Sequence, residues 1–259
     1  MSERLRVYTT LAIVLRRRDQ GEADRVLTLL TPERGKLNAI AKGVRKVRSR
    51  KAGHLELFAR AQLTLAKGRT FDIITQAELV EPHLRLREDV ERGGLAHYLC
   101  ELTEQFAPEG SESAALFDLL AEGLLWLCEA ADPFTAVRAY ELRLLTLEGY
   151  RPQLFVCAQT ERPLEIDSDP QVTQVIFSPR SGGALSATAS EHARDGFSIS
   201  REALLALRRL QTSPDNQILS LTLPQGVRTE VTRTTQTYLA HILERRLRSL
   251  AVLSQLQAR

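Results

Sequence analysis

Aromatic residues, cysteines and long apolar runs are all scarce in this sequence of 259 residues. Aromatic side chains make up 5% of it, so binding modes that stack many rings on flat ligands are disfavoured. The three cysteines (Cys100, Cys128 and Cys157) are too few for a disulfide framework, and the first two lie in apolar helical patterns where we expect buried thiols. No apolar run approaches about 18 residues, so we expect no membrane-spanning helix and no membrane partner.

Sequence signatures of catalysis and of secretion are also missing. Gly35-Lys36 lacks both the upstream glycine and the following Ser or Thr of a phosphate-binding loop. There is no H-E-x-x-H, G-x-S-x-G or G-x-G-x-x-G motif, and the five histidines are scattered along the chain. The N-terminus carries charge but no apolar run of signal-peptide length, so the cytoplasm is the expected compartment. Together these absences favour a binding protein over an enzyme.

The positive charge is concentrated in the first third of the chain. Residues 1–80 hold 17 Lys/Arg against 8 Asp/Glu, a surplus of nine positive charges. Residues 81–259 hold the other 18 Lys/Arg against 24 Asp/Glu, a surplus of six negative charges. This division predicts an anionic partner for the N-terminal part and a different role for the rest.

One stretch is strongly basic. Between Lys42 and Lys51 there are six basic residues and no acidic one. Such a density of like charge repels itself, so we expect it on the surface, where a polyanion that displaces its counterions stabilises it. A solvated loop that only aids solubility is the alternative, and for an isolated basic run it is about as frequent. The position of the stretch inside a predicted β-barrel favours a binding site.

Residues 7–80 read as β structure with glycine-containing turns. Residues 36–42 alternate, with Leu37, Ala39 and Ala41 on one side, although Ile40 breaks the pattern. Five short strands in about 75 residues suit a closed OB-type barrel, and an SH3-like barrel fits almost as well. The predicted strands are Val7–Leu15, Val26–Thr31, Lys36–Lys42, Leu55–Leu65 and Thr70–Leu79.

From Glu81 onward the apolar period becomes helical. Ser111 or Ser113 is expected to cap one helix, Asp132-Pro133 begins the next, and Gly149 ends it. Residues 150–198 carry four prolines and read as irregular, after which Ser200 should cap a helix that runs to Leu210. A final helix is predicted over 229–256. It carries Leu239, Leu243, Leu247 and Leu250 on one stripe, with Arg245, Arg246 and Arg248 mostly off it.

Three blocks of the sequence, taken together in their order and spacing, match one known family. The first is Gly35-Lys36-Leu37, Ala41-Lys42-Gly43-Val44-Arg45, Ser49-Arg50 and Leu55-Glu56-Leu57-Phe58. The second is Glu148-Gly149-Tyr150-Arg151-Pro152-Gln153-Leu154-Phe155-Val156-Cys157 with Phe177-Ser178-Pro179-Arg180-Ser181-Gly182-Gly183. The third is Tyr238-Leu239, His241 and Leu243-Glu244-Arg245-Arg246-Leu247-Arg248-Ser249-Leu250. No single block carries the resemblance, but with all three the sequence resembles the RecO family of bacterial recombination mediators over essentially its whole length.

The resemblance implies an α+β protein: an N-terminal OB-fold followed by a helical domain with an inserted zinc module, here degenerate. The implied domains are 1–80 (OB-fold), 81–149 (helical bundle), 150–198 (irregular insert) and 199–259 (helices that complete the helical domain). In many members four cysteines bind zinc, but this chain has Thr160, Ser186 and Ala189 at the positions that would join Cys157. Because structural zinc sites are almost always complete, we predict no zinc and no other cofactor. Packing of Tyr150, Leu154, Phe155, Ile176 and Phe177 is then expected to hold the insert.

The resemblance also implies a non-enzymatic function in the repair and recombination of nucleoid DNA in the cytoplasm. The family binds single- and double-stranded DNA, anneals strands, binds the acidic tail of single-stranded DNA-binding protein, and with RecR helps to load RecA. With only Tyr8, Phe58 and Phe71 as rings, and two of them expected in the core, residues 1–80 should bind phosphates rather than stack on bases. The candidate DNA-binding residues are Arg34, Lys36, Lys42, Arg45, Lys46, Arg48, Arg50 and Lys51.

Two other classes of function remain open from the sequence. The basic loop could dock on an acidic protein surface, which would make the chain a protein-interaction adaptor with incidental DNA contact. An RNA-binding translation or ribosome factor is compatible with a basic OB-like domain, but the long helical region adds nothing to that hypothesis. The sequence does not indicate which helical surface would bind the tail, the RecR stoichiometry, the oligomeric state, or whether RecF is used.

Overall fold

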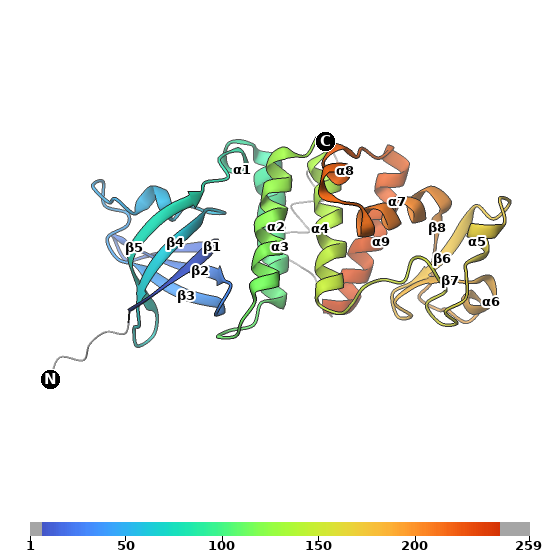
Figure 1. Ribbon diagram of the computed structural model, residues 1–259, viewed down its shortest axis with the longest axis horizontal. Coiled ribbons are helices and arrows are strands. Elements are labelled where there is room, and N and C mark those ends of the chain that lie inside the picture. Colours follow the sequence, from blue (N-terminus) through green and yellow to red (C-terminus); the bar gives the residue numbers. More distant parts are fainter. Residues whose placement is uncertain (1–6, 244–259) are drawn as a thin grey trace. The chain divides into compact units, whose positions relative to one another are not determined.

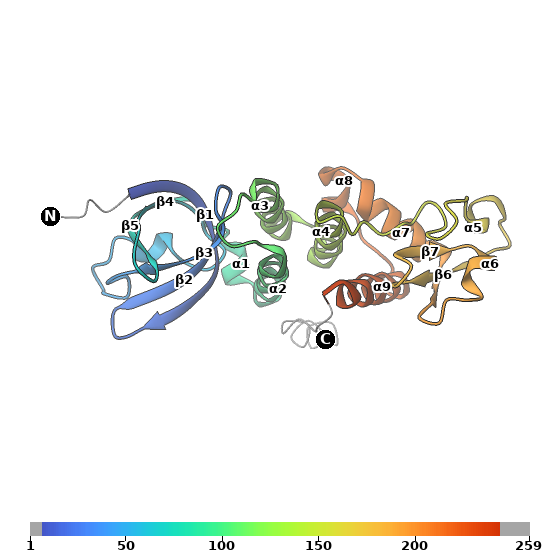
Figure 2. The same ribbon diagram turned by 90° about the horizontal axis from the view of Figure 1, so that it is seen from below.

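The chain begins with a five-stranded barrel. The structure is a computed structural model that describes residues 7–243 (Figure 1). The strands close in the order β1-β2-β3-β5-β4, and β1 pairs antiparallel with both β2 and β4 while β3 and β5 run parallel (Figure 2). The five strands are β1 (Val7–Gln20), β2 (Asp24–Thr31), β3 (Gly35–Ala41), β4 (Arg60–Ala66) and β5 (Asp72–Glu81).

Alternating apolar side chains fill the inside of this barrel. Val14, Leu27, Leu63 and Ile74 belong to one buried cluster that draws on four strands. On β3 the predicted alternation is confirmed, because Ala39 and Ala41 are buried while Asn38 is exposed. Closure removes the free sheet edges, so the backbone groups of the barrel pair internally and loops carry its exposed charges.

Two predicted strand limits were wrong. The first strand does not stop at Leu15, because the ladder continues from Arg16–Thr28 to Gln20–Asp24 after a bulge, with the arginine side chains facing solvent. The fourth strand does not begin at Leu55. A 3-10 turn at Ala52–His54 (η1) occupies this region, and Phe58 has a left-handed backbone with φ 67°, which no strand residue adopts.

Helices follow the barrel, and the first three form one compact unit with it, up to Cys128. They are α1 (Arg85–Glu88), α2 (Val90–Phe106) and α3 (Ala114–Glu129). The Asp89 carboxylate caps α2 by accepting from the backbone N–H of Arg92. The loop between α2 and α3 holds the β2–β3 turn, since the N–H of Lys36 donates to the Pro108 carbonyl over 2.8 Å. Gly35 is required in that turn: its φ is +57°, and a Cβ there would lie 2.3 Å from the Pro108 oxygen.

The second unit begins at Glu129, and its helix boundaries follow the sequence signals closely. Asp132 caps α4 (Pro133–Leu147) by accepting from Phe134 N–H over 3.0 Å, and Gly149 follows with φ +83°. Ser200 caps the helix after the insert, so these three predictions are confirmed. Helix α4 packs against α7 (Arg201–Thr212), α8 (Asp215–Ser220) and α9 (Gln225–Leu243).

The final predicted helix is described only in part. Leu239 is buried on α9, as its stripe predicts. The remainder of that prediction (Arg245, Arg246, Leu247, Arg248 and Leu250) lies outside the described residues. None of the described helices combines the length and the apolar character that a membrane span needs.

The segment 150–198 is not an irregular insert, which corrects the prediction. It contains short α5 (Glu165–Ser168) and α6 (Ala187–Ser190), and a sheet in the order β7-β6-β8. We call residues 150–200 the insert module. Tyr150 and Phe155 are 45% and 43% exposed, so they do not hold it together, whereas Leu154 and Phe177 are buried. Its strands are β6 (Gln174–Ser178), β7 (Gly183–Leu185) and β8 (Phe197–Ser200).

The two compact units do not follow the predicted four-part division. The predicted boundary at residue 80 falls at the end of β5, and the predicted boundaries at 149 and 198 fall inside the second unit. The predicted functional division of the chain is not tested by this geometry and stays a prediction.

Candidate nucleic-acid interface

Strand β3 separates the eight candidate residues into two groups. Arg34 and Lys36 lie at its start, in and just after the β2–β3 turn, and the other six lie beyond its end in the loop 42–51. Seven residues of extended chain span about 20 Å, so the two groups occupy opposite ends of one strand. The structure therefore does not bring all eight together.

The loop 42–51 is anchored where it leaves β3. The N–H of Gly43 donates to Asp24 Oδ1 over 2.7 Å, and the N–H of Arg45 donates to the Ala23 carbonyl over 3.0 Å. Between them, the Val44 side chain belongs to the buried cluster of the barrel. The loop root is thus part of the fold rather than a free hinge.

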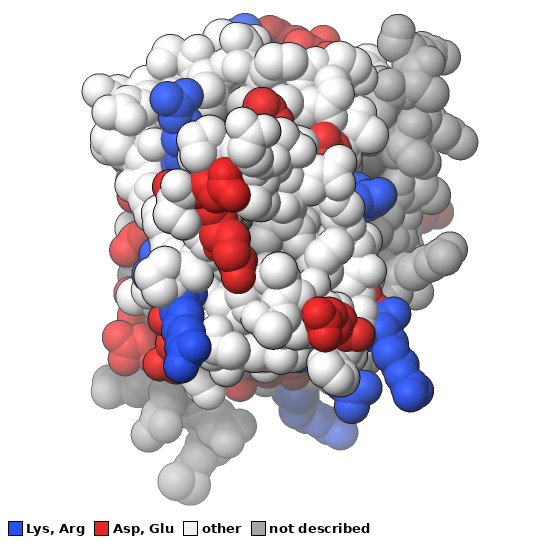
Figure 3. Space-filling view, turned by 90° about the vertical axis from the view of Figure 1, so that its right-hand side faces the viewer, with Lys and Arg blue, Asp and Glu red and all other residues white. Residues whose placement is uncertain are grey.

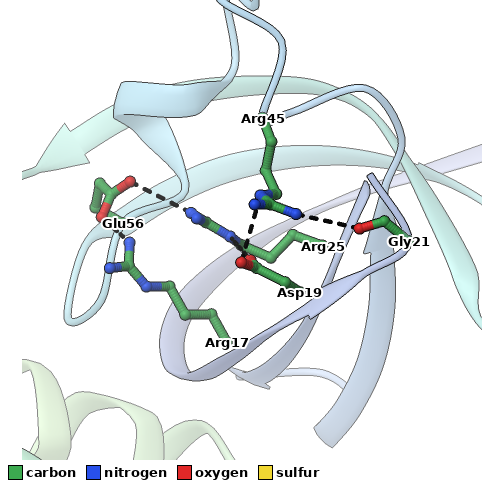
Figure 4. Close-up of polar contacts among 6 residues, drawn as sticks. All are labelled: Arg17, Asp19, Gly21, Arg25, Arg45 and Glu56. Atoms are coloured by element: carbon green, nitrogen blue, oxygen red, sulfur yellow. Dashed lines mark hydrogen bonds and ion pairs between the residues drawn. The ribbon is translucent and has the colours of Figure 1, made fainter. Parts of the chain in front are cut away.

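An alternating chain of charges reinforces this root (Figure 4). Arg45 Nε lies 3.3 Å from Asp19 Oδ2, and its Nη1 donates to the Gly21 carbonyl over 3.1 Å. Arg25 joins the two carboxylates, with Nε 2.9 Å from Asp19 and Nη1 3.5 Å from Glu56, which also accepts from Arg17. The hydrogen bond from Arg25 holds the pKa of Asp19 below its usual value against the opposing effect of burial, and the charge of Arg45 adds to the lowering.

Lys51 closes the loop on its other side. Its Nζ donates to the Ile74 carbonyl over 2.8 Å, and its side chain is half-buried. Burial lowers the pKa of Lys51, and the nearby Asp24 charge opposes that effect. Arg45 and Lys51 are therefore engaged in holding the loop.

The remaining four cations of the loop are Lys42, Lys46, Arg48 and Arg50, which we call the tip cations. All four are exposed, and within residues 7–243 they have no acidic partner. Val47 lies among them and is fully exposed. Like charges on an anchored loop cannot move far apart. A multivalent anion therefore lowers the electrostatic free energy of this group more than scattered counterions do.

At the other end of β3, Arg34 belongs to a different arrangement. Its guanidinium lies 4.2 Å from the ring centre of Tyr8, whose hydroxyl donates to Asp72. Asp72 also accepts from the N–H of Gly68. The contacts from Arg34 to Tyr8 and from Tyr8 to Asp72 thus connect the β2–β3 turn to the β4–β5 loop. Burial, and then the hydrogen bond to Asp72, raises the pKa of Tyr8.

Three further basic residues lie at that end of β3: Lys36, and Lys67 and Arg69 of the β4–β5 loop. Lys36 Nζ lies 3.8 Å from Glu109 Oε1, a distance for a weak pair. Lys67 and Arg69 are exposed beside Gly68 and are not among the eight candidate residues. The basic turn Lys67-Gly68-Arg69 was visible in the sequence, but its proximity to Tyr8 required the barrel register, which sets Val7 opposite Ala66 and Tyr8 opposite Leu65.

The barrel offers few rings for stacking. Phe58 is 2% exposed, as expected for a core ring, while Phe71 is half-buried with Arg18 5.9 Å from its centre. Tyr8 is half-buried beneath Arg34. An array of freely exposed rings is therefore lacking in the described part of the barrel, and phosphate contacts are the binding mode that its side chains support.

A pocket of about 630 Å³ lies within the first unit, between the barrel and α1–α2. Its wall combines apolar Leu57 and Leu86 with Val90, which is 84% exposed. Arg17 and Arg87 provide positive charge at the same pocket, and Glu56 and Asp89 offset part of it. Such a mixed pocket suits a peptide with apolar and acidic groups better than it suits an extended polyanion.

The charged groups of the insert module are arranged differently. Viewed from the side on which α5 and α6 lie, the surface is mostly uncharged, with separate acidic and basic groups (Figure 3). No cluster of three or more His, Cys, Asp or Glu suited to a metal ion occurs among residues 7–243. The absence of zinc stays a prediction, which metal analysis of the purified protein tests.

Two models of one protein family match most of this chain. Residues 4–83 match the family model described as Recombination protein O N terminal, and residues 87–251 match Recombination protein O C terminal. The DNA repair protein RecO of Roseiflexus sp. (strain RS-1) is 41% identical over 252 residues, which cover 97% of this chain and 87% of the relative. The RecO of Pelotomaculum thermopropionicum is 36% identical over 251 residues (97% and 95%), and that of Dehalococcoides mccartyi (strain CBDB1) is 32% identical over 250 residues (96% and 96%). The chain belongs to the RecO family.

Proposed function

We propose that this protein is a non-enzymatic DNA repair and recombination mediator that binds single- and double-stranded DNA through phosphate contacts. In this proposal it anneals complementary strands and, with RecR, helps to load RecA onto strands coated by single-stranded DNA-binding protein, in the cytoplasm at the nucleoid. Its membership of the RecO family supports the general role. The observation that carries the DNA-binding part is the set of four tip cations on an anchored loop, which have no acidic partner among the residues that the structure describes.

The same geometry supports annealing. A protein that grips phosphates leaves the base edges free to pair, whereas one that stacks bases on rings would compete with pairing. Tyr8 and Phe71 are both half-buried beside arginines, so base stacking has little surface here. Binding should therefore depend strongly on salt and weakly on sequence.

We infer that the barrel is of the OB type. Its strand order β1-β2-β3-β5-β4, closed by the pairing of β1 with β4 and by a parallel β3–β5 contact, fits a five-stranded Greek-key barrel. In such barrels the β1–β2 and β4–β5 loops border the nucleic-acid surface. Here the β1–β2 loop contains Gly21, which accepts from Arg45, and the β4–β5 loop contains Lys67 and Arg69. Both loops adjoin candidate residues.

Fluorescence anisotropy with labelled single strands tests DNA binding. Wild type should bind a mixed-sequence strand and a homopolymer with similar affinity at low salt. Reversal of three tip cations (Lys46→Glu, Arg48→Glu and Arg50→Glu) should abolish that binding while circular dichroism stays unchanged, because none of the three anchors the loop. Absence of binding by the wild type at low salt, or unchanged binding by the triple variant, would remove the DNA hypothesis and favour the protein-interaction adaptor.

Among the proposed partners, the tail of single-stranded DNA-binding protein can be assigned a candidate place. We propose that its acidic and apolar end occupies the pocket beside α1–α2, where Arg87 and Val90 are both exposed. Arg87→Glu and Val90→Asp should each weaken binding of the tail peptide at least tenfold, while DNA binding stays within about twofold. Arg209→Glu, on α7, is the matched control. Equal effects of all three variants would exclude this pocket.

A further inference from the structure

The pocket beside α1–α2 and the root of the basic loop are connected by one series of ion pairs. Arg17 and Glu56 line the pocket, and the Glu56 carboxylate accepts from the Arg17 guanidinium (Figure 4). The same carboxylate lies 3.5 Å from Arg25 Nη1. Arg25 also binds Asp19, which pairs with Arg45 of the loop. We call these five residues the charge chain: Arg17, Glu56, Arg25, Asp19 and Arg45.

The fold of the barrel fixes the order of the charge chain. Arg17 and Asp19 are two residues apart on β1, so their side chains project from the same face of the strand. Arg25 stands directly opposite Asp19 in the β1–β2 ladder, where cross-strand side chains meet. The other two members come from either side of η1, because Arg45 precedes it and Glu56 follows it. The pocket therefore adjoins one end of the charge chain and the loop adjoins the other.

The charge chain carries more positive than negative charge. Its three arginines contact only two carboxylates, so one positive charge is not neutralised within it. Arg25 contacts both carboxylates, and only 17% of its side chain is exposed. The side chains of Arg17 and Arg45 are 33% and 35% exposed, and each contacts one of the two carboxylates. The excess charge is therefore accessible to an outside anion at both ends of the charge chain.

The charge of Arg17 acts on the pocket and on the loop root alike. The hydrogen bond from Arg25 is the main cause that lowers the pKa of Asp19, and the charges of Arg45, Arg25 and Arg17 add to the lowering. Within the pocket, burial lowers the pKa of His97, and the charge of Arg17 lowers it further. A change in how Arg17 is neutralised is therefore felt at the carboxylate that holds Arg45.

We propose that the charge chain is a shared anion site, for which an acidic peptide in the pocket and a DNA phosphate at the loop root compete. This inference rests on the proposed function, which assigns both ligands to the first unit. A peptide carboxylate that binds Arg17 releases Glu56, which then pairs more closely with Arg25. Asp19, held less tightly by Arg25, neutralises Arg45 instead. A phosphate at Arg45 shifts both carboxylates in the opposite direction, so each ligand weakens the binding of the other.

The competition links the tip cations to the pocket. Arg45 directly precedes the tip cation Lys46, so a phosphate bound at the tip lies near the end of the charge chain. Two ligands that act on one equilibrium change each other's affinity by the same factor. Because the two end arginines are partly exposed, water screens the effect, and we expect a factor of about three. Capture of DNA by the loop then favours release of the peptide.

Titrations with both ligands test the shared site. A fluorescent tail peptide of single-stranded DNA-binding protein is titrated with the full-length protein at low salt, with and without a saturating unlabelled single strand. The strand should raise the Kd of the peptide about threefold, and saturating peptide should raise the Kd of the strand by the same factor. If both ligands bind and neither changes the Kd of the other, the shared site is wrong while the proposed function stands. A peptide that does not bind would remove the pocket, and the inference with it.

Two substitutions separate transmission through the charge chain from direct repulsion between the two ligands. Asp19→Asn interrupts the charge chain between pocket and loop, so the strand should no longer change the Kd of the peptide. Glu104→Gln removes the same charge from a neighbouring pair with Arg16, outside the charge chain, and should keep the effect of about threefold. If Asp19→Asn does not fold, Glu56→Gln interrupts the charge chain at its other carboxylate. Competition that persists at full strength in the interrupted variant, or that vanishes in Glu104→Gln, would overturn the proposal.

Discussion

Three arginines of the second unit and the four tip cations of the barrel loop differ in whether they have a carboxylate partner. In the second unit, Arg138 is buried, donates to Thr235 over 3.1 Å and lies 3.0 Å from Glu141. Arg228 pairs with Asp132 over 3.1 Å, and Arg208 binds Asp167 through both terminal guanidinium nitrogens. The tip cations of the loop are exposed and have no such carboxylate among the described residues.

Pairing and clustering together, rather than the count of basic residues, single out the loop tip as the candidate phosphate-binding surface, because the exposed arginines Arg162, Arg180, Arg194 and Arg209 of the second unit are spread along the chain. A cation whose field is cancelled by a nearby carboxylate offers little to a phosphate, while an unpaired one releases a counterion when a phosphate arrives. Within the loop itself, Arg45 and Lys51 resemble the second unit because they are engaged in holding structure. The barrel therefore uses some cations for anchoring and presents others.

The largest expected effect comes from the buried arginine. Arg138→Met removes the ion-pair partner of fully buried Glu141 and should lower the free energy of unfolding by about 3–5 kcal/mol. Arg48→Met, the same change at the loop tip, should stay within about 0.5 kcal/mol. Chemical denaturation measures both.

A compensating variant separates charge burial from loss of packing. Arg138→Met/Glu141→Leu should recover most of the lost stability, because no charge is then left in the interior. If the double variant were no more stable than Arg138→Met, the ion pair would not explain the cost. If Arg48→Met were equally destabilising, the contrast between the two regions would collapse.

A smaller effect is expected at the start of α4. Asp132 caps the helix through Phe134 N–H and also pairs with Arg228. Asp132→Ala loses both and should cost about 1–2 kcal/mol, while Asp132→Asn keeps the cap and should cost less. Equal losses for the two variants in denaturant titrations would assign the effect to the charge rather than to the cap.

The smallest effect concerns the exposed pair at the loop root. Because the folded pKa of Asp19 is depressed, its contribution is present above the unfolded value of 3.8 and is lost as the pH falls through the lower folded value. The melting temperatures of wild type and Asp19→Asn should differ slightly at neutral pH and converge in acid below that value. A difference that persists in acid would show that the carboxylate acts through something other than its charge.

Local signals predicted the parts of this fold that depend on a few neighbouring residues. Asp132-Pro133, Gly149 and Ser200 mark helix ends because caps act within one turn. Short strands β6 to β8 were missed, since four prolines and few alternating positions hide them. Phe155 was assigned to the core on hydrophobicity alone, yet it lies half outside with Arg208 5.1 Å from its ring centre.

The sequence could not predict which candidate cations anchor the loop and which are left without a partner, because that depends on contacts between residues distant in the sequence. The density of Lys and Arg in the basic stretch predicts that it is exposed, and the exposure is confirmed for Lys42, Arg45 and Arg48. Which cation meets which carboxylate depends on the register of β1 against β2, which brings Asp19 to Arg25, and on the loop that brings Arg45 to Asp19.

The salt dependence of single-strand binding tests the central claim most directly. If each of the four tip cations contacts one phosphate, neutralising Lys42, Lys46, Arg48 and Arg50 to Gln should reduce the slope of log affinity against log salt by about 2.8. Neutralising the exposed second-unit arginines Arg162, Arg180, Arg194 and Arg209 removes the same charge and should leave the slope nearly unchanged. An unchanged slope in the tip variant, or an equal reduction in both, would contradict the claim that the loop tip is the phosphate-binding surface.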